Sequence, residues 1–264
     1  MPDDQPIDLR LDVPHGARIW NYWLGGKDNY PADREVGDAV KALFPTTAEY
    51  ALKSRQFLIR AVRYLARDAG VRQFLDVGTG LPTMQNTHEV AQAVAPESKV
   101  VYVDNDPLVL AHARALLVNT TAEGVTRYID ADYHDTDLII DGAREVLDLD
   151  QPVAVLFMGV FGYVSEAAEA RSIIRRLMAP MSSGSHLALW DATNTSPAVV
   201  AAAKAQADMG SPYELRSVEE IASWFDGTDM VEPGLVPVTQ WRPDRTDVGS
   251  TEPIDAYGAV AIKP

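Results

Sequence analysis

The sequence of 264 residues contains no cysteine. This absence excludes disulfide bonds, thiolate metal ligands and cysteine nucleophiles together. Histidine is also sparse, and its five positions show no metal-binding pattern such as H-E-x-x-H: His15, His88, His112, His134 and His186. We therefore expect no metal site.

Long apolar segments are missing as well. No apolar run approaches the ~18 residues that a membrane-spanning helix needs. The first residues, Met1-Pro2-Asp3-Asp4, are acidic and do not resemble a signal peptide. The sequence therefore predicts a cytoplasmic protein that does not enter a membrane.

Basic residues are fewer than acidic ones. The 38 Asp and Glu residues outnumber the 23 Lys and Arg residues, which gives a formal net charge of −15. Binding to nucleic acid relies on clustered basic residues that neutralise phosphates, so nucleic acid is not an expected partner. The charge favours a small-molecule substrate, or a protein with a basic patch, and it does not indicate an oligomeric state.

The sequence does contain a pattern typical of nucleotide sites. An apolar segment at 73–77 runs into the turn Gly78-Thr79-Gly80, and a second apolar segment at 99–103 ends in Asp104. In Rossmann-like folds the glycines of the first turn give a ligand access to the backbone, and an acid after the second strand holds ribose hydroxyls. The pattern therefore predicts a βαβ nucleotide site. The alternative is a tight strand-to-helix turn that binds no ligand.

The details of the turn bear on which nucleotide binds. A dinucleotide fingerprint requires a third glycine, as in G-x-G-x-x-G. Counting from Gly78, that third position is Thr83, and the preceding Pro82 restricts the backbone. No G-x-x-x-x-G-K-[ST] sequence occurs, so a P-loop is excluded. The turn has the form acid-x-Gly-x-Gly, with Asp76 as the acid, and a dinucleotide-dependent dehydrogenase is disfavoured.

Strands and helices alternate after residue 70, which predicts a mostly parallel sheet with right-handed crossovers. We expect strands at 73–77, 99–103, 125–130, 153–158 and 186–190, and an antiparallel pair near 235–241 and 257–262. Expected helices cover 33–44, 47–69, 86 onward, 106–117, 137–147, 166–178 (capped by Ser165) and 217–226. The expected fold is Rossmann-like α/β, a seven-stranded mostly parallel sheet with a C-terminal antiparallel hairpin. Residues 1–70 are expected to form a lid segment and a helical preface, and residues 71–264 one Rossmann-like domain.

Six blocks of the sequence carry a family resemblance: 18–29 (RIWNYWLGGKDN), 78–83 (GTGLPT), 86–90 (NTHEV), 101–107 (VYVDNDP), 220–222 (EIA) and 237–243 (PVTQWRP). In these blocks the chain resembles an actinobacterial family of S-adenosylmethionine (SAM)-dependent methyltransferase-like proteins, long catalogued as a domain of unknown function. The likeness spans nearly the whole chain. It implies a class I methyltransferase fold, with SAM as cofactor bound by residues 71–264. It also implies a small-molecule acceptor, such as one of specialised metabolism.

The expected cofactor site lies at the carboxyl ends of the strands, where open α/β sheets bind ligands. The glycine turn would admit the methionyl part of SAM, and Asp104 would accept both ribose hydroxyls. The residues expected to bind the cofactor are Tyr22, Gly26, Lys27, Gly78, Thr79, Gly80, Asp104, Asn105, Asp132, Tyr133, Met158 and Gly159. For Asp132 the alternative is a solvated acid in an acidic run, and for Met158 it is a core position.

Aromatic residues surround two glycines in the segment 20–30. This composition predicts a mobile lid that covers the cofactor. Alternatively, the aromatic residues anchor the preface on the domain. Lys27 and Arg18 are candidates to meet the methionine carboxylate, and Arg55 and Arg60 are rival candidates.

The sequence leaves three functions open. The first is SAM-dependent methyl transfer to a small molecule, the second is SAM binding without catalysis, and the third, less favoured, is NAD-dependent oxidoreduction. No catalytic residue is assigned, because methyl transfer depends mainly on positioning and needs a base only when the acceptor loses a proton. Tyr163 and His15 could serve as a base or an orienting group, but each type is more often structural.

Overall fold

The structure, a computed structural model, describes residues 10–82, 85–116, 119–244 and 251–264. Its centre is a sheet with the strand order β3-β2-β1-β4-β5-β8-β6, and β7 pairs with β8. The strands are β1 Gln73–Val77, β2 Lys99–Asp104, β3 Val125–Asp130, β4 Ala154–Met158, β5 His186–Ala192, β6 Asp229–Met230, β7 Val236–Pro237 and β8 Ala256–Ile262. Residues 1–9 of the expected lid segment, and Leu117 of an expected helix, lie outside the described residues.

The topology confirms the expected Rossmann-like α/β fold. Strands β1 to β5 run parallel to their neighbours, and β8 runs antiparallel beside β5. The C-terminal pair is shorter than expected, because only Val236–Pro237 pairs with β8 and residues 238–240 form a 3-10 turn. Pro237 has no N–H with which to extend the ladder. The two-residue strand β6 brings the described sheet to eight strands instead of seven.

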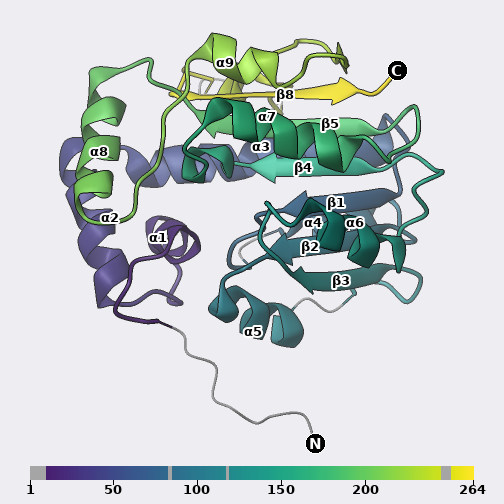
Figure 1. Ribbon diagram of the computed structural model, residues 1–264, viewed down its shortest axis with the longest axis horizontal. Coiled ribbons are helices and arrows are strands. Elements are labelled where there is room, and N and C mark those ends of the chain that lie inside the picture. The colour runs from purple at the N-terminus through teal and green to yellow at the C-terminus, as the bar shows by residue number, and fades with distance from the viewer. Residues whose placement is uncertain (1–9, 83–84, 117–118, 245–250) are drawn as a thin grey trace, which may run out of the picture.

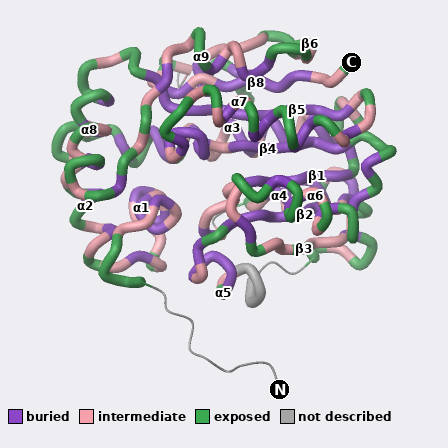
Figure 2. Tube along the Cα trace, in the orientation of Figure 1, coloured by how far each residue is buried: buried purple, intermediate pink, exposed green. Residues whose placement is uncertain are grey.

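Helices cover both faces of the sheet (Figure 1). Their bounds are α1 Gly16–Trp23, α2 Pro31–Leu43, α3 Thr47–Arg67, α4 Thr87–Val94, α5 Pro107–Leu116, α6 Thr136–Arg144, α7 Ala167–Met178, α8 Pro197–Asp208 and α9 Val218–Ser223. The core on one face joins α6, α7 and α9, and the core on the other joins α3 and α4. Along β1 the side chains alternate, since Leu75 and Val77 belong to the first core and Phe74 to the second. Figure 2 shows the central strands buried throughout, as a sheet covered on both faces requires.

The helix ends follow local signals. The expected capping boxes at Asn86 and Ser217 are both present, and they open α4 and α9. The expected cap of α7 is wrong by one residue, because Glu166 and not Ser165 precedes its first turn. The sequence analysis does not predict α8, although Ser196 caps it and Pro197 occupies its first position. Its alanine-rich sequence presents little of the apolar periodicity that identifies a helix.

The preface packs against a helix from the far end of the sequence. Residues Ile19 and Trp23 of α1, Val36 of α2 and Ala202 of α8 share a small core beside the sheet, and α2 lies along α8. Helix α3 contributes residues such as Phe57 to the core that it shares with α4 on one face of the sheet. A domain division at residue 70 stays a prediction. No helix in the described ranges is long and apolar enough to cross a membrane.

Candidate functional site

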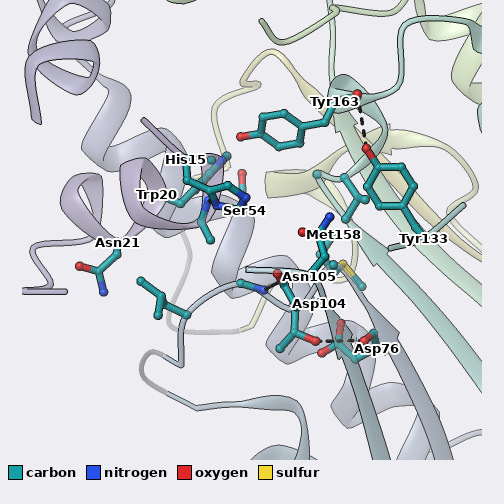
Figure 3. Close-up of a pocket in the computed structure, with 18 of the residues that line it drawn as sticks. His15, Trp20, Asn21, Ser54, Asp76, Asp104, Asn105, Tyr133, Met158 and Tyr163 are labelled. Atoms are coloured by element: carbon teal, nitrogen blue, oxygen red, sulfur yellow. Dashed lines mark hydrogen bonds between the residues drawn. The ribbon is translucent and has the colours of Figure 1, made fainter. Parts of the chain in front are cut away.

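A cavity of about 370 Å³ lies at the carboxyl ends of β1, β2 and β4, with α1 and one face of α3 forming its other walls. Figure 3 shows these elements and the side chains that point into the space. This is the crevice in which open α/β sheets bind ligands. Its volume falls within the range of small-molecule sites.

The glycine turn forms the floor of the cavity. The backbone N–H groups of Gly78 and Thr79 both donate to the carbonyl oxygen of Val103, at 2.8 and 3.1 Å, which fastens the end of β1 to the end of β2. Gly78 has a φ of +72°, and a Cβ there would come within 2.5 Å of the Val160 side chain. Only glycine adopts this conformation readily and also fits the space. Gly80 has a φ of +66°, but a Cβ there would meet nothing closer than 3.9 Å.

Asp104 closes the floor at the end of β2. Its Oδ2 accepts the N–H of Gly80 at 2.7 Å, and its Oδ1 accepts the N–H of Asp106 at 3.0 Å. Burial raises the pKa of Asp104, although these two backbone bonds oppose the shift. A carboxylate has about four acceptor positions, so each oxygen can still accept a ligand hydroxyl. The residue lines the cavity.

The residues expected around the adenine are only partly brought together. Asn105 and Tyr133 line the cavity, whereas Asp132 does not. Asp132 instead accepts the Asn105 side-chain amide at 2.7 Å and the backbone N–H of His134 at 2.9 Å. Its place is therefore behind Asn105. Burial and the nearby charge of Asp132 raise the pKa of Tyr133 to about 12.

The end of β4 forms the adjoining wall. Met158 and Gly159 both line the cavity, as expected. Gly159 has a φ of +74°, and a Cβ there would lie 2.6 Å from the indole of Trp190. The missing side chain therefore lets the β5 residue Trp190 reach the cavity, which it also lines.

The structure does not place Tyr22, Gly26 or Lys27 in the cavity lining, which corrects the expectation for the lid segment. Residues 20–23 of this segment belong to the helix α1, and the cavity-facing positions of α1 and its C-cap follow helical spacing: Gly16, Ala17, Trp20, Asn21 and Leu24. Tyr22 lies on another face and donates to Asp38 of α2 at 2.6 Å. Lys27 is exposed, and at Gly26 a Cβ would collide with Asn21.

Among the rival cations, Arg55 lines the cavity and the others do not. Arg18 is buried, with its Nε 3.5 Å from Asp33 and 3.7 Å from Asp106. Arg60 donates to the backbone oxygens of residues 238 and 241. The guanidinium of Arg55 donates to the Gln85 carbonyl at 3.0 Å. Burial lowers the pKa of Arg55, and the charge of Asp76 opposes that shift.

Several lining residues were missed by sequence reasoning. Asp76 carries the motif, yet its own place in the lining was not expected: it is buried and accepts the Thr87 hydroxyl at 2.6 Å, and burial raises its pKa to about 6. Helical spacing in α1 could have identified Trp20. No sequence signal indicates Ser211 or Trp190 as neighbours of the glycine turn, because tertiary packing alone brings them there.

The chain was compared with known proteins. The sequence model of a family described as S-adenosyl methyltransferase matches residues 2–264. A DUF574 family protein from Streptomyces avermitilis is 44% identical, with a TM-score of 0.93 over 97% of this chain and 100% of the other. A protein from Thermobifida fusca, provisionally named a methyltransferase, is 35% identical, with a TM-score of 0.87 over 97% of both chains.

More distant structures share the fold alone. A plantazolicin methyltransferase, solved with a triazolic desmethylPZN analogue and S-adenosylhomocysteine (SAH), is 11% identical, with a TM-score of 0.52 over 94% of this chain and 95% of the other. The search of curated proteins found no match. The family match covers nearly all of the chain, and the two actinobacterial relatives do so as well. The protein therefore belongs to the S-adenosyl methyltransferase family and is a SAM-dependent methyltransferase with a class I, Rossmann-like fold.

Proposed function

We propose that the protein transfers the methyl group of SAM to a small-molecule acceptor, and that both bind in the cavity at the strand ends. The observation that carries this proposal is the buried carboxylate of Asp104, which faces the cavity directly beside the glycine turn. A carboxylate in this place can accept two ribose hydroxyls in charge-assisted hydrogen bonds. No dinucleotide site is proposed, since Pro82 follows the turn where a flexible backbone would be needed.

The lining residues fit the three parts of SAM. Asp104 would hold the ribose, with Asn105 and Tyr133 beside the adenine. The backbone of 78–80 would lie under the methionyl part, because the turn has no side chain larger than that of Thr79. Arg55 is the cation in reach of the methionine carboxylate, in place of Lys27.

The reaction requires positioning and the exclusion of water. SAM supplies a methyl group on a sulfonium, which leaves by in-line displacement when an acceptor atom attacks. The chain supplies the walls. Trp20 from α1 covers the cavity, and Met158 and Trp190 form its side at the ends of β4 and β5. Fixing two reactants in the right orientation between such walls can lower the barrier of this type of step substantially.

The acceptor is proposed to be a small molecule because of the shape of the site. The cavity holds about 370 Å³ and α1 forms one of its walls, a size typical of small-molecule sites. The net charge of −15 also disfavours nucleic acid. A compound of specialised metabolism would suit a site of this size.

Calorimetric titration and turnover test the proposal together. We expect SAH and SAM to bind and NAD not to bind. We also expect slow release of SAH from SAM when a pool of small neutral acceptors is supplied. NAD binding without a response to SAM would overturn the site assignment. SAM binding without turnover on any acceptor would instead indicate a binding module.

A further inference from the structure

We propose that the acceptor is an uncharged, largely apolar molecule, and that the hydroxyl of Tyr163 donates a hydrogen bond to it and thereby determines specificity. This inference rests on the proposed function, because it assumes that SAM occupies the floor of the cavity. The space in question is the acceptor side of the cavity, defined by Trp20, Leu24, Met158, Tyr163, Trp190 and Pro212.

The walls of the acceptor side are apolar and aromatic. The rings of Trp20 and Trp190 meet edge to face, with centroids 5.7 Å apart and an interplanar angle of 66°. The Asp, Arg and His residues among those described in the lining all belong to the floor: Asp104 and His15 near the end of β2, and Asp76 and Arg55 around the start of α4. An ionised group placed on the acceptor side would lose its hydration and would find no oppositely charged side chain among the residues that define that side. The walls therefore favour a neutral ligand.

Tyr163 supplies the polar contact in this apolar space. It lies in the 3-10 turn Phe161–Tyr163 that follows β4, and its ring packs edge-on against Tyr213 at a centroid distance of 4.9 Å. Its hydroxyl reaches across to α1, where a Cβ on Gly16 would come within 2.2 Å of it. Figure 3 shows the hydroxyl pointing toward the part of α1 that carries Trp20. The absence of a side chain at Gly16 therefore leaves the space that this hydroxyl occupies.

The hydrogen bonding of Tyr163 makes its hydroxyl a donor. A polar contact with the Trp20 side chain opposes the rise in the pKa of Tyr163, and an indole N–H can only donate, so at that contact the phenolic oxygen is the acceptor. Burial raises the pKa of Tyr163, with Trp20 opposing the shift, so the group keeps its proton at neutral pH. None of the described residues accepts that proton. By contrast, the nearby Ser54 hydroxyl already donates to the Tyr50 carbonyl at 2.9 Å. A polar hydrogen in an apolar cavity is expected to meet an acceptor atom of the ligand.

Matched probes can test this inference directly. Quinoline and isoquinoline are neutral at slightly alkaline pH and carry one acceptor nitrogen, whereas naphthalene has the same shape without it. The cation 1-methylquinolinium and the anion 2-naphthoate add charge to that shape. Binding of each probe to the SAH-saturated protein would be measured by ligand-observed NMR titration. We expect quinoline or isoquinoline to bind about three- to ten-fold more tightly than naphthalene, the range of one neutral hydrogen bond, and both charged probes to bind more weakly than naphthalene.

The variant Tyr163→Phe keeps the ring and removes the donor. It should abolish the preference for the nitrogen-containing probes while leaving the affinities for naphthalene and SAH unchanged, a result that a general packing defect would not produce. Ser211→Ala is the matched control, since Ser211 also lines the cavity and its removal should leave the preference intact. The inference is overturned if Tyr163→Phe retains the preference, if Ser211→Ala loses it, if a charged probe binds best, or if SAH binds and no probe does. Failure of SAH itself to bind would overturn the proposed function.

Discussion

Replacing Asp104 tests the cofactor site at its most specific point. The carboxylate is proposed to accept two ribose hydroxyls, and hydrogen bonds to charged groups contribute about 1.5–3 kcal/mol each, with context able to halve that value. Two halved contributions amount to about 1.5–3 kcal/mol. Asp104→Ala should therefore weaken SAH binding by roughly ten- to a hundred-fold or more. Asp104→Asn should lose less, because one acceptor oxygen remains.

The structure also predicts a cost in stability for these variants. Asp104 accepts the backbone N–H groups of Gly80 and Asp106, and leaving a buried donor without a partner costs about 1–3 kcal/mol. Relief of the buried charge, which raises the pKa of Asp104, offsets part of that cost. We therefore expect Asp104→Ala to remain folded with a free energy of unfolding lower by about 1–3 kcal/mol.

Calorimetric titration with SAH and urea denaturation would measure the two effects separately. Asp130→Ala is the matched control, because Asp130 pairs in register with Asp104 at the end of the next strand but is exposed and does not line the cavity. Its affinity for SAH should change less than about two-fold, the scale of an ordinary surface substitution. Wild-type affinity in a folded Asp104→Ala protein would show that the ribose is held elsewhere, and the site assignment would be wrong.

Residues around the floor of the cavity allow three more tests. Gly78→Ala should lower the free energy of unfolding, measured by urea denaturation, by more than Gly70→Ala does. Both positions have a φ near +71°, but only at Gly78 would a Cβ also clash, 2.5 Å from the Val160 side chain. Equal losses of stability would contradict this reasoning. Arg55→Gln should weaken the binding of SAH by roughly ten-fold or more and change the binding of 5′-methylthioadenosine, which lacks the carboxylate, by less than about two-fold. Both affinities would be measured by calorimetry, with Lys27→Gln as the control. Equal effects on the two ligands would exclude a contact between Arg55 and the carboxylate. The third prediction concerns Asp76, because burial raises its pKa from 3.8 to about 6. The folded protein therefore binds this proton more tightly than the unfolded chain does. The contribution of Asp76 to stability should fall as the pH rises from about 4 to about 6 and stay constant above that pH. The free energy of unfolding of the wild type relative to Asp76→Asn should decrease by up to about 3 kcal/mol over that interval, and a difference independent of pH would show that the pKa is not raised.

Local patterns in the sequence identified the frame of the site. The turn at Gly78 and Gly80 and the acid at Asp104 are readable because each belongs to one short segment with a fixed spacing. The expected strands 73–77 and 125–130 match β1 and β3, since both segments contain the β-branched and aromatic residues that favour strands. The capping boxes at Asn86 and Ser217 are local as well. The family resemblance rested on six short blocks of the sequence, and the family match over residues 2–264 confirms it.

The covering of the site was decided by tertiary structure. The sequence analysis placed Tyr22, Gly26 and Lys27 at the cofactor by composition, but the rotation of α1 turns Trp20 and Asn21 to the cavity instead. That rotation is set by the small core that α1 and α2 share with α8, a helix about 170 residues further along the chain that the sequence analysis does not predict.

The same holds for the acceptor side and for Arg55. Trp190 reaches the cavity because Gly159, which directly follows the neighbouring strand β4, leaves room for its ring. Tyr163 reaches α1 because Gly16 has no side chain. Arg55 lines the cavity where α3 lies against α4, and its guanidinium donates to the Gln85 carbonyl just before that helix. The sequence by itself determined the fold class, the family resemblance and the pairing of the glycine turn with Asp104, since these depend on short segments with a fixed spacing. The walls depend on contacts between distant segments, and only their packing in three dimensions fixes which side chains face the ligand.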